Sequence, residues 1–397
     1  MRRDFYQAIS DELNNLKING TYKFFKHNTN AMDNKINIED YGEAIVLCSN
    51  NYLGLANKKE IIEAAHIALE KYGAGAGSVR FIAGTYDIHR ELEEKLASFL
   101  NMEASITYSS CWAANTAAIP ALLSNGDTVI SDELNHASII DGCRAVSRGV
   151  NRAVYKHSDM QDLEEKLIQS NESGAILVVT DGVFSMEGDI AKLPEIISLC
   201  RKYNAILMLD DSHATGVIGK TGKGTMEYFN VNDGVDIISG TFGKALGGAG
   251  GGFIAASKDI CSILAQRSRP HLFSNGLPPV LCSIALTAIE YLESNPAIVK
   301  SLKEKTLYMR KKLKESGYAP LEGDSAIVPI IVGDTAKAIA IAQEMLKEGI
   351  YATGFGFPVV PEGSARIRLQ ISDALSYEDL DEALSVMKKL KREFAGI

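Results

Sequence analysis

The sequence predicts an α/β fold: a large domain built on a mostly parallel sheet with helices on both faces, followed by a smaller α+β domain. Seven short runs of apolar and β-branched residues lie between residues 105 and 256, and the stretches between them can hold crossover helices. Beyond residue 295 the pattern changes to charged helical stretches with isolated strands. A length of 397 residues also exceeds what one ordinary hydrophobic core supports, which favours two domains.

The elements are predicted in chain order as follows. Residues 1–20 predict an amphipathic helix because Phe5, Ile9, Leu13 and Leu16 recur near helical spacing, and the polar residues 26–40 then indicate an arm or loop. The strands of the sheet are expected at residues 105–109, 128–131, 153–156, 176–180, 206–209, 236–239 and 252–256. A helix at 299–316, a strand at 326–332, a helix at 336–348, a strand at 366–371 and a helix from residue 376 complete the chain. These elements predict an N-terminal helix and arm (1–45), a large domain (46–294) and a C-terminal small domain (295–397).

The composition indicates which partners and which compartment can be expected for this protein. The formal net charge of −9 argues against nucleic acid, because neutralising phosphates requires a basic surface. The six cysteines are scattered and none has Cys-x-x-Cys spacing, which favours reduced thiols in a cytoplasmic protein. The sequence contains no signal peptide, no apolar stretch long enough to cross a membrane and no clustered Cys/His set for a metal.

The strongest local signal is one lysine, Lys244, in a turn rich in glycine and hydroxyl residues just after a predicted strand. Burial lowers the pKa of a lysine and frees its amine as a nucleophile for Schiff-base chemistry. The small neighbours would let a flat cofactor approach the backbone. The alternative, a solvated loop lysine, is about equally compatible with this loop alone.

A second signal lies where an apolar strand ends in Asp210 and Asp211, with His213 close behind. Ligands of open parallel sheets gather beyond the carboxyl ends of the strands. A buried carboxylate there can keep a pyridine nitrogen protonated, which makes a pyridoxal ring an electron sink. One of the two acids could instead cap the following helix, and the periodicity does not distinguish them.

Two further strand ends carry candidate residues. Ser110, Cys111 and Trp112 open a helical run, whose free N–H groups and positive end suit a phosphate. For Trp112, the only tryptophan, simple core packing is the favoured interpretation when the residue is taken in isolation. His136 follows another strand and could stack on a ring, bind a substrate carboxylate or make a structural polar contact. The glycine-rich stretches do not complete a nicotinamide-binding motif.

The order of these signals along the chain, helix start, histidine, acid and lysine, resembles that of type I pyridoxal phosphate enzymes. More specifically, the chain resembles the α-oxoamine synthase family and, within it, the members that acetylate glycine. The resemblance rests on residues 48–55, 78–85, 135–142, 180–186, 210–213, 240–248, 267–270 and 354–361, which cover nearly the whole chain in family order.

The resemblance implies a role for each matching residue. Lys244 would carry pyridoxal 5′-phosphate and transfer protons, Asp210 would pair with the pyridine nitrogen, and Asp211 would be left as the capping acid. His136 would stack on the ring, while His213 and Ser185 would hydrogen-bond near its oxygen. The phosphate would be held by Cys111, Trp112 and Thr241 and, from the neighbouring subunit of an obligate homodimer, by Ser274 and Asn275. Asn50 and Arg368 would bind the substrate carboxylate, Arg368 as a bidentate fork. Trp112 departs from the family pattern, in which a smaller aromatic residue is common.

The implied reaction joins glycine and acetyl-CoA to give 2-amino-3-oxobutanoate and CoA, and runs in reverse in threonine catabolism. The alternative within the family is a longer acyl-CoA or another amino acid, as in enzymes like 8-amino-7-oxononanoate synthase or serine palmitoyltransferase. An aminotransferase shares the fold, and a scaffold that has lost its cofactor is a third possibility.

Overall fold

The computed structural model describes residues 2–393 and divides the chain into two compact units. The terminal unit comprises Met1–Ser49, Met186–Gly188 and Glu304–Ile397, and the sheet unit comprises Asn50–Ser185 and Asp189–Lys303. The N-terminal segment, which the sequence pattern set apart as residues 1–45, therefore folds together with the C-terminal residues. A local pattern cannot reveal this pairing, because the contacts join opposite ends of the chain.

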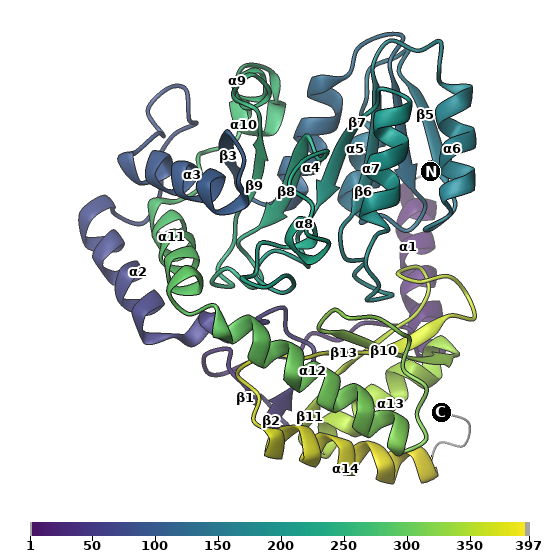
Figure 1. Ribbon diagram of the computed structural model, residues 1–397. Coiled ribbons are helices and arrows are strands. Elements are labelled where there is room, and N and C mark those ends of the chain that lie inside the picture. The colour runs from purple at the N-terminus through teal and green to yellow at the C-terminus, as the bar shows by residue number, and fades with distance from the viewer. Residues whose placement is uncertain (1, 394–397) are drawn as a thin grey trace. The chain divides into compact units, whose positions relative to one another are not determined.

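The sheet unit is built on one seven-stranded sheet in the order β3-β9-β8-β7-β6-β4-β5 (Figure 1). Only β9 runs against its neighbours; the other pairings in the sheet are parallel. The strands are β3 (Ala104–Tyr108), β4 (Thr128–Asp132), β5 (Asn151–Tyr155), β6 (Ile176–Asp181), β7 (Ile206–Asp210), β8 (Ile237–Thr241) and β9 (Gly252–Ala256). The predicted mostly parallel α/β sheet is thus confirmed, with all seven strands in the predicted places.

Helices surround this sheet and supply the rest of the core. They are η1 (Leu55–Asn57), α2 (Lys59–Tyr72), α3 (Asp87–Leu100), α4 (Cys111–Leu122), α5 (Ala137–Arg144), α6 (Met160–Gln169), α7 (Leu193–Lys202), α8 (Thr225–Tyr228), α9 (Lys258–Arg267), α10 (Arg269–Phe273) and α11 (Pro279–Ser294). Helix α4 is apolar all round and lies in the core with α5 and the strands, where Ala114, Ala117 and Ala118 are fully buried. Its small side chains bring the helix axis close to the sheet, which fixes the position of its first turn.

The terminal unit contains two small sheets, β1-β2-β11 and β10-β13-β12. Its strands are β1 (Lys35–Ile38), β2 (Gly42–Val46), β10 (Ile327–Gly333), β11 (Ile350–Tyr351), β12 (Thr353–Phe355) and β13 (Ala365–Gln370), and its helices are α1 (Arg2–Ile18), α13 (Thr335–Lys347) and α14 (Tyr377–Glu393). Helix α12 (Ala297–Glu315) crosses the boundary between the units. The expected arm at residues 26–40 is wrong in its last part, because β1 forms there and pairs with β2.

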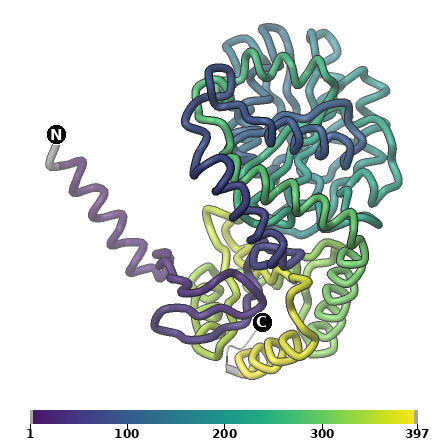
Figure 2. The backbone as a smooth tube through the Cα atoms, turned by 90° about the vertical axis from the view of Figure 1, so that its left-hand side faces the viewer, coloured from purple at the N-terminus to yellow at the C-terminus, as the bar shows by residue number. Residues whose placement is uncertain are grey.

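Helix α1 has the predicted amphipathic pattern, but its apolar side chains are not buried against the rest of the chain. Figure 2 shows α1 extending away from the other elements of the terminal unit. Phe5 remains 64% exposed, and Ile9, Leu13 and Leu16 are also exposed. Among the described residues, no helix has the length and apolarity needed to cross a membrane.

Candidate active site

A cavity of about 200 Å³ opens at the carboxyl ends of the parallel strands of the sheet unit. Parallel sheets bind ligands at this edge because several strand ends and helix starts converge there. The lining residues are Ser110, Cys111, Trp112, His136, Asp181, Val183, Asp210, Ser212, His213, Thr241 and Lys244. The cavity therefore brings together eight of the residues singled out from the sequence: Ser110, Cys111, Trp112, His136, Asp210, His213, Thr241 and Lys244.

Asp210 is the last residue of β7 and is 3% exposed. Its Oδ2 accepts a hydrogen bond from Asn115 Nδ2 at 2.6 Å, and its Oδ1 accepts one from the backbone N–H of Ser212 at 2.9 Å. Asp211, by contrast, accepts bonds from Thr225 Oγ1 at 2.6 Å and Thr225 N at 2.9 Å, and does not line the cavity. The structure therefore distinguishes the positions of the two acids. Asp210 lines the cavity, whereas Asp211 accepts hydrogen bonds from the first residue of α8.

A second carboxyl group, Asp181, lies beside Asp210 because the two residues are register partners in β6 and β7. Asp181 is 4% exposed and its Oδ2 accepts the backbone N–H of His136 at 2.9 Å. Burial raises the pKa of Asp181 well above its usual value, and the neighbouring charge of Asp210 raises it further. Burial and the neighbouring carboxylate of Asp210 therefore both favour the protonated form of Asp181.

His136 is held in one tautomer by its own loop. The Oγ of Ser138 accepts a hydrogen bond from Asn115 Nδ2 at 2.9 Å, so its own hydrogen is directed to His136 Nδ1 at 2.7 Å. The backbone N–H of Ser138 also points at Nδ1, at 3.2 Å. Nδ1 is therefore an acceptor and the ring proton sits on Nε2. Burial lowers the pKa of His136, and the charge of Lys244 lowers it further against the opposing effect of Asp210, which keeps the ring neutral.

Lys244 lies three residues beyond β8, in a half-buried turn. Burial raises the pKa of Cys111 and of Asp181, and the charge of Lys244 partly opposes this shift in both groups. The same charge adds to the effect of burial that lowers the pKa of His136. Thr241 is fixed at the base of the turn, since its Oγ1 donates to the Gly251 carbonyl at 3.0 Å and accepts the Gly243 N–H at 3.0 Å.

The start of α4 forms a wall of the same cavity. Ser110 caps the helix through a 3.1 Å hydrogen bond from the Ala113 N–H to its Oγ. The N–H groups of Cys111 and Trp112 belong to the first turn, where a helix offers no internal acceptor. Gly252 is required here, because a Cβ at this position would lie 2.2 Å from the backbone nitrogen of Cys111. Trp112 packs its ring edge against His136 with 5.8 Å between ring centroids.

His213 is another polar residue that lines the cavity. Its Nδ1 lies 2.7 Å from the hydroxyl of Tyr52, a side chain with no exposed surface. Such a contact fixes the orientation of the imidazole, so that its other edge faces the cavity that His213 lines.

The remaining residues chosen from the sequence lie outside this lining. Asn50 and Ser185 are half-buried in the sheet unit, and Ser274 and Asn275 are exposed just after α10. Arg368 belongs to the terminal unit and is 8% exposed. The structure thus brings most of the residues expected at the cofactor into one cavity but leaves these five, Ser185 among them, outside the cavity wall.

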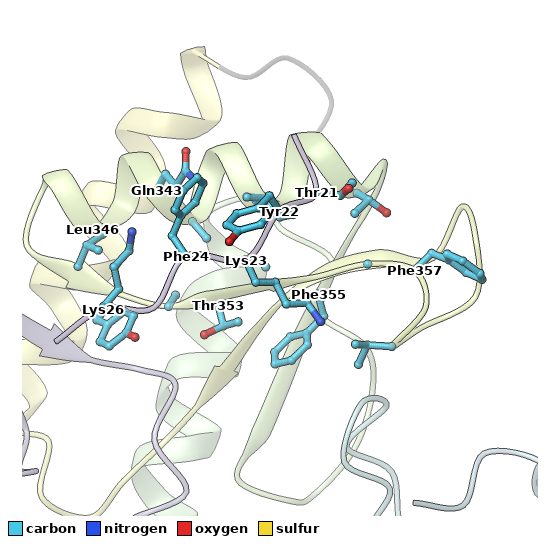
Figure 3. A pocket seen from close by; sticks show the side chains of 18 residues that line it. Thr21, Tyr22, Lys23, Phe24, Lys26, Gln343, Leu346, Thr353, Phe355 and Phe357 are labelled. Carbon is cyan, nitrogen blue, oxygen red and sulfur yellow. The ribbon is translucent and has the colours of Figure 1, made fainter. Parts of the chain in front are cut away.

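Arg368 lies in β13 of the terminal unit, which also contains a second cavity of about 300 Å³. Figure 3 shows Phe355 among the residues that line this cavity. The guanidinium of Arg368 donates to Gln370 Oε1 at 2.9 Å and sits 4.5 Å from the centre of the Phe355 ring. Phe355 lines that second cavity, together with Tyr22, Phe24 and Phe357. Arg368 is therefore held in place by neighbours in β12 and β13.

The sequence did not reveal three residues that organise the cavity: Asn115, Ser138 and Asp181. Asn115 joins Asp210 to Ser138, and Asp181 holds the backbone of His136. Asp181 could have been found, since it ends a predicted strand as Asp210 does. Asn115 could not, because it lies inside a helical run and 95 residues from its carboxylate partner.

Comparison with known proteins places this arrangement in a family. The family model of class I and II aminotransferases matches residues 43–387. The 2-amino-3-ketobutyrate coenzyme A ligase of Escherichia coli is 44% identical over 399 residues and covers 100% of both chains. The 8-amino-7-oxononanoate synthase of Thermoanaerobacter pseudethanolicus is 42% identical over 97% of both chains. A solved serine palmitoyltransferase structure containing pyridoxal phosphate superposes with a TM-score of 0.93, at 28% identity and 98% coverage of both chains. The chain therefore belongs to the class I and II aminotransferase family and, within it, to the α-oxoamine synthases.

Proposed function

We propose that this chain is a glycine C-acetyltransferase that interconverts glycine and acetyl-CoA with 2-amino-3-oxobutanoate and CoA, as a step of threonine catabolism. The observation that carries the proposal is the match to a 2-amino-3-ketobutyrate coenzyme A ligase over the full length of both chains. Its cofactor is pyridoxal 5′-phosphate. The six cysteines are all unpaired, which supports a cytoplasmic location.

The cavity of the sheet unit fits this cofactor by the chemistry of its groups. Lys244 offers an amine, Asp210 a buried carboxylate, and the first turn of α4 offers N–H donors for a phosphate, with Thr241 in the same cavity. The close approach of Gly252 to Cys111 leaves no side chain in the way of that first turn. Once bound, the cofactor supplies an electron-withdrawing ring that makes the Cα–H bond of glycine acidic.

The residues of the chain supply binding and proton transfer. The Lys244 amine takes the proton from Cα, and Asp210, oriented by Asn115, holds a proton at the ring nitrogen. His136 would present its Nε2–H to the cavity as a neutral donor, and His213, held by Tyr52, would hydrogen-bond the cofactor oxygen. We assign Ser185 to the same oxygen, and Asn50 and Arg368 to the substrate carboxylate.

We also propose a homodimer in which Ser274 and Asn275 serve the phosphate of the partner subunit. Both are exposed, and Phe273 before them is 69% exposed. Phe81 and Ile82 are 64% and 69% exposed, and the segment that carries them is joined to Asn275 by a bridge from Val79. Large exposed apolar side chains of this kind support an interface with a second copy. Sedimentation velocity should therefore give a dimer mass.

The competing assignment within the family is a longer acyl donor or another amino acid. The two other relatives described above, a synthase for 8-amino-7-oxononanoate and a serine palmitoyltransferase, support it less well because their identities of 42% and 28% are lower. Turnover of acetyl-, pimeloyl- and palmitoyl-CoA with glycine, alanine and serine decides between them. The proposed function predicts the highest kcat/KM for acetyl-CoA with glycine.

The central test is Lys244→Ala. We expect turnover to fall by about 1,000-fold or more, because the amine is both the attachment point and the base. Borohydride should fix the cofactor to the wild-type chain but not to the variant. Lys220→Ala, which removes an exposed loop lysine, is the matched control and should keep full activity. Steady-state turnover by Lys244→Ala near the wild-type rate would refute the assignment.

A further inference from the structure

His157, another histidine of the sheet unit, lies between two carboxylates outside the cavity. Its Nδ1 is 3.0 Å from Asp132 Oδ1, and its Nε2 is 3.0 Å from Asp189 Oδ2. The side chain is 18% exposed, while that of Asp132 is 1% exposed. The ring edge also packs on the buried ring of Phe184, with 4.4 Å between centroids.

The contacts determine the charge of this ring. A neutral imidazole carries one N–H, so one of its nitrogens would face a carboxylate oxygen without a proton between them. An imidazolium donates to both oxygens, and each bond is then charge-assisted. Burial lowers the pKa of His157, but the hydrogen bonds and charges of Asp132 and Asp189 outweigh it and raise the pKa to about 10.

The two carboxylates belong to different loops at the edge of the cavity. Asp132 ends β4 and begins the loop that carries His136; its Oδ1 also accepts the Leu134 N–H at 2.9 Å. Asp189 closes the loop after β6, where its carbonyl accepts the Phe184 N–H at 3.1 Å. Ser185 lies inside that loop, and Val183 at its base lines the cavity.

The backbone around His157 is tied to the same acids and to neighbouring charged groups. The Ser158 N–H donates to Asp132 Oδ2 at 3.1 Å, and the His157 N–H donates to Glu133 Oε1 at 2.9 Å. Lys192 Nζ donates to the Ser158 carbonyl at 3.0 Å. Ser158 has a φ of 52°, a conformation that persists only where surrounding contacts hold it.

We propose that His157, as an imidazolium, is a positioning residue that clamps together the loop carrying His136 and the loop carrying Ser185. The clamp fixes the distance between the two loop bases, and so the place from which each loop delivers its side chain to the cavity. Displacing a catalytic group by about 1 Å is enough to slow a reaction up to about 100-fold. The inference rests on the proposed function for the roles of His136 and Ser185.

The test compares His157→Gln with His27→Gln in the full-length holoenzyme. His27 forms an exposed pair with Glu39 at 2.7 Å. Its variant therefore removes a histidine–carboxylate contact that is far more exposed than those of His157. We expect His157→Gln to lower kcat about tenfold with KM for glycine within about twofold, because positioning acts on the reacting geometry. His27→Gln should match the wild type. Asp189→Asn, which removes the half-exposed acid, should lower kcat in the same direction.

Nitrogen NMR of histidine-labelled protein tests the clamp independently of turnover. The resonances lost in His157→Gln should show both ring nitrogens protonated from pH 6 to above 9, as a raised pKa requires. Wild-type kcat in both His157→Gln and Asp189→Asn, or a His157 signal that titrates between about pH 6 and 7, would overturn the proposal. If His157→Gln does not fold, kcat of Asp189→Asn decides. A wild-type enzyme without acyl transfer would instead refute the proposed function, while the NMR titration would still decide the clamp.

Discussion

His136 and His157 are the same residue type at the carboxyl edge of the same sheet, yet they are held in opposite charge states. His136 accepts two hydrogen bonds at Nδ1 from Ser138, and desolvation lowers its pKa, so it stays neutral. His157 faces a carboxylate at each nitrogen and is charged. The neutral ring has two donors at Nδ1, whereas the charged ring has a carboxylate at each nitrogen that outweighs the effect of burial.

The largest expected effect is on the neutral histidine. His136→Gln should lower kcat roughly 100-fold, because removing one oriented donor from a reaction site typically has this effect. Steady-state kinetics with glycine and acetyl-CoA measure it. A variant with wild-type kcat would show that His136 only packs beside Trp112, as a structural histidine would.

A smaller effect is expected from Ser138→Ala, which removes one of the two donors to His136 Nδ1 and the link to Asn115. The ring is then free to carry its proton on either nitrogen, so we expect a loss in kcat of about tenfold. The pH profile of kcat should also shift, since a ring without its Ser138 bond gains a proton more easily. An unchanged kcat and pH profile would show that the backbone N–H alone fixes the tautomer.

The smallest effect concerns stability and pH. The folded-state pKa of His157 is about 10, against about 6.5 in an unfolded chain, so its contribution is fully present below pH 6.5. It is lost as the pH rises through about 10. Wild type should therefore exceed His157→Gln in Tm by roughly 2 °C at pH 6.5, and the gap should close toward pH 10. A gap that widens with pH would reverse the charge assignment.

The two histidines also show which functional residues the sequence alone could predict and which it could not. His136 was predicted because it follows a strand end within a dense local motif. His157 also follows a predicted strand (153–156), but it was missed because its two carboxylate partners lie 25 and 32 residues away, and only the parallel order of β4, β5 and β6 brings them together. Local patterns find groups that act where the chain places them, but not groups defined by distant partners.

The strand boundaries show the same limit at closer range. The strand predicted at residues 206–209 extends to Asp210, and that predicted at 176–180 extends to Asp181. An acid is interpreted as loop because it lacks strand propensity. Here the sheet continues through it, since the neighbouring strand supplies the register partner. The apolar runs therefore predicted the fold. Whether each strand extends to its terminal acid, and so where that carboxyl group lies in the cavity, depends on the pairing of the strands.

The left-handed backbone of Ser158 has a consequence for how this position can vary. Any Cβ crowds the following carbonyl oxygen in that conformation, at about 1–2 kcal/mol, and a side chain branched at Cβ is an outlier there, whereas glycine and asparagine adopt it readily. Chains that share the paired carboxylates should therefore carry a small or amide residue after the histidine. A valine or isoleucine there would mark a relative whose two loops are held apart by other means.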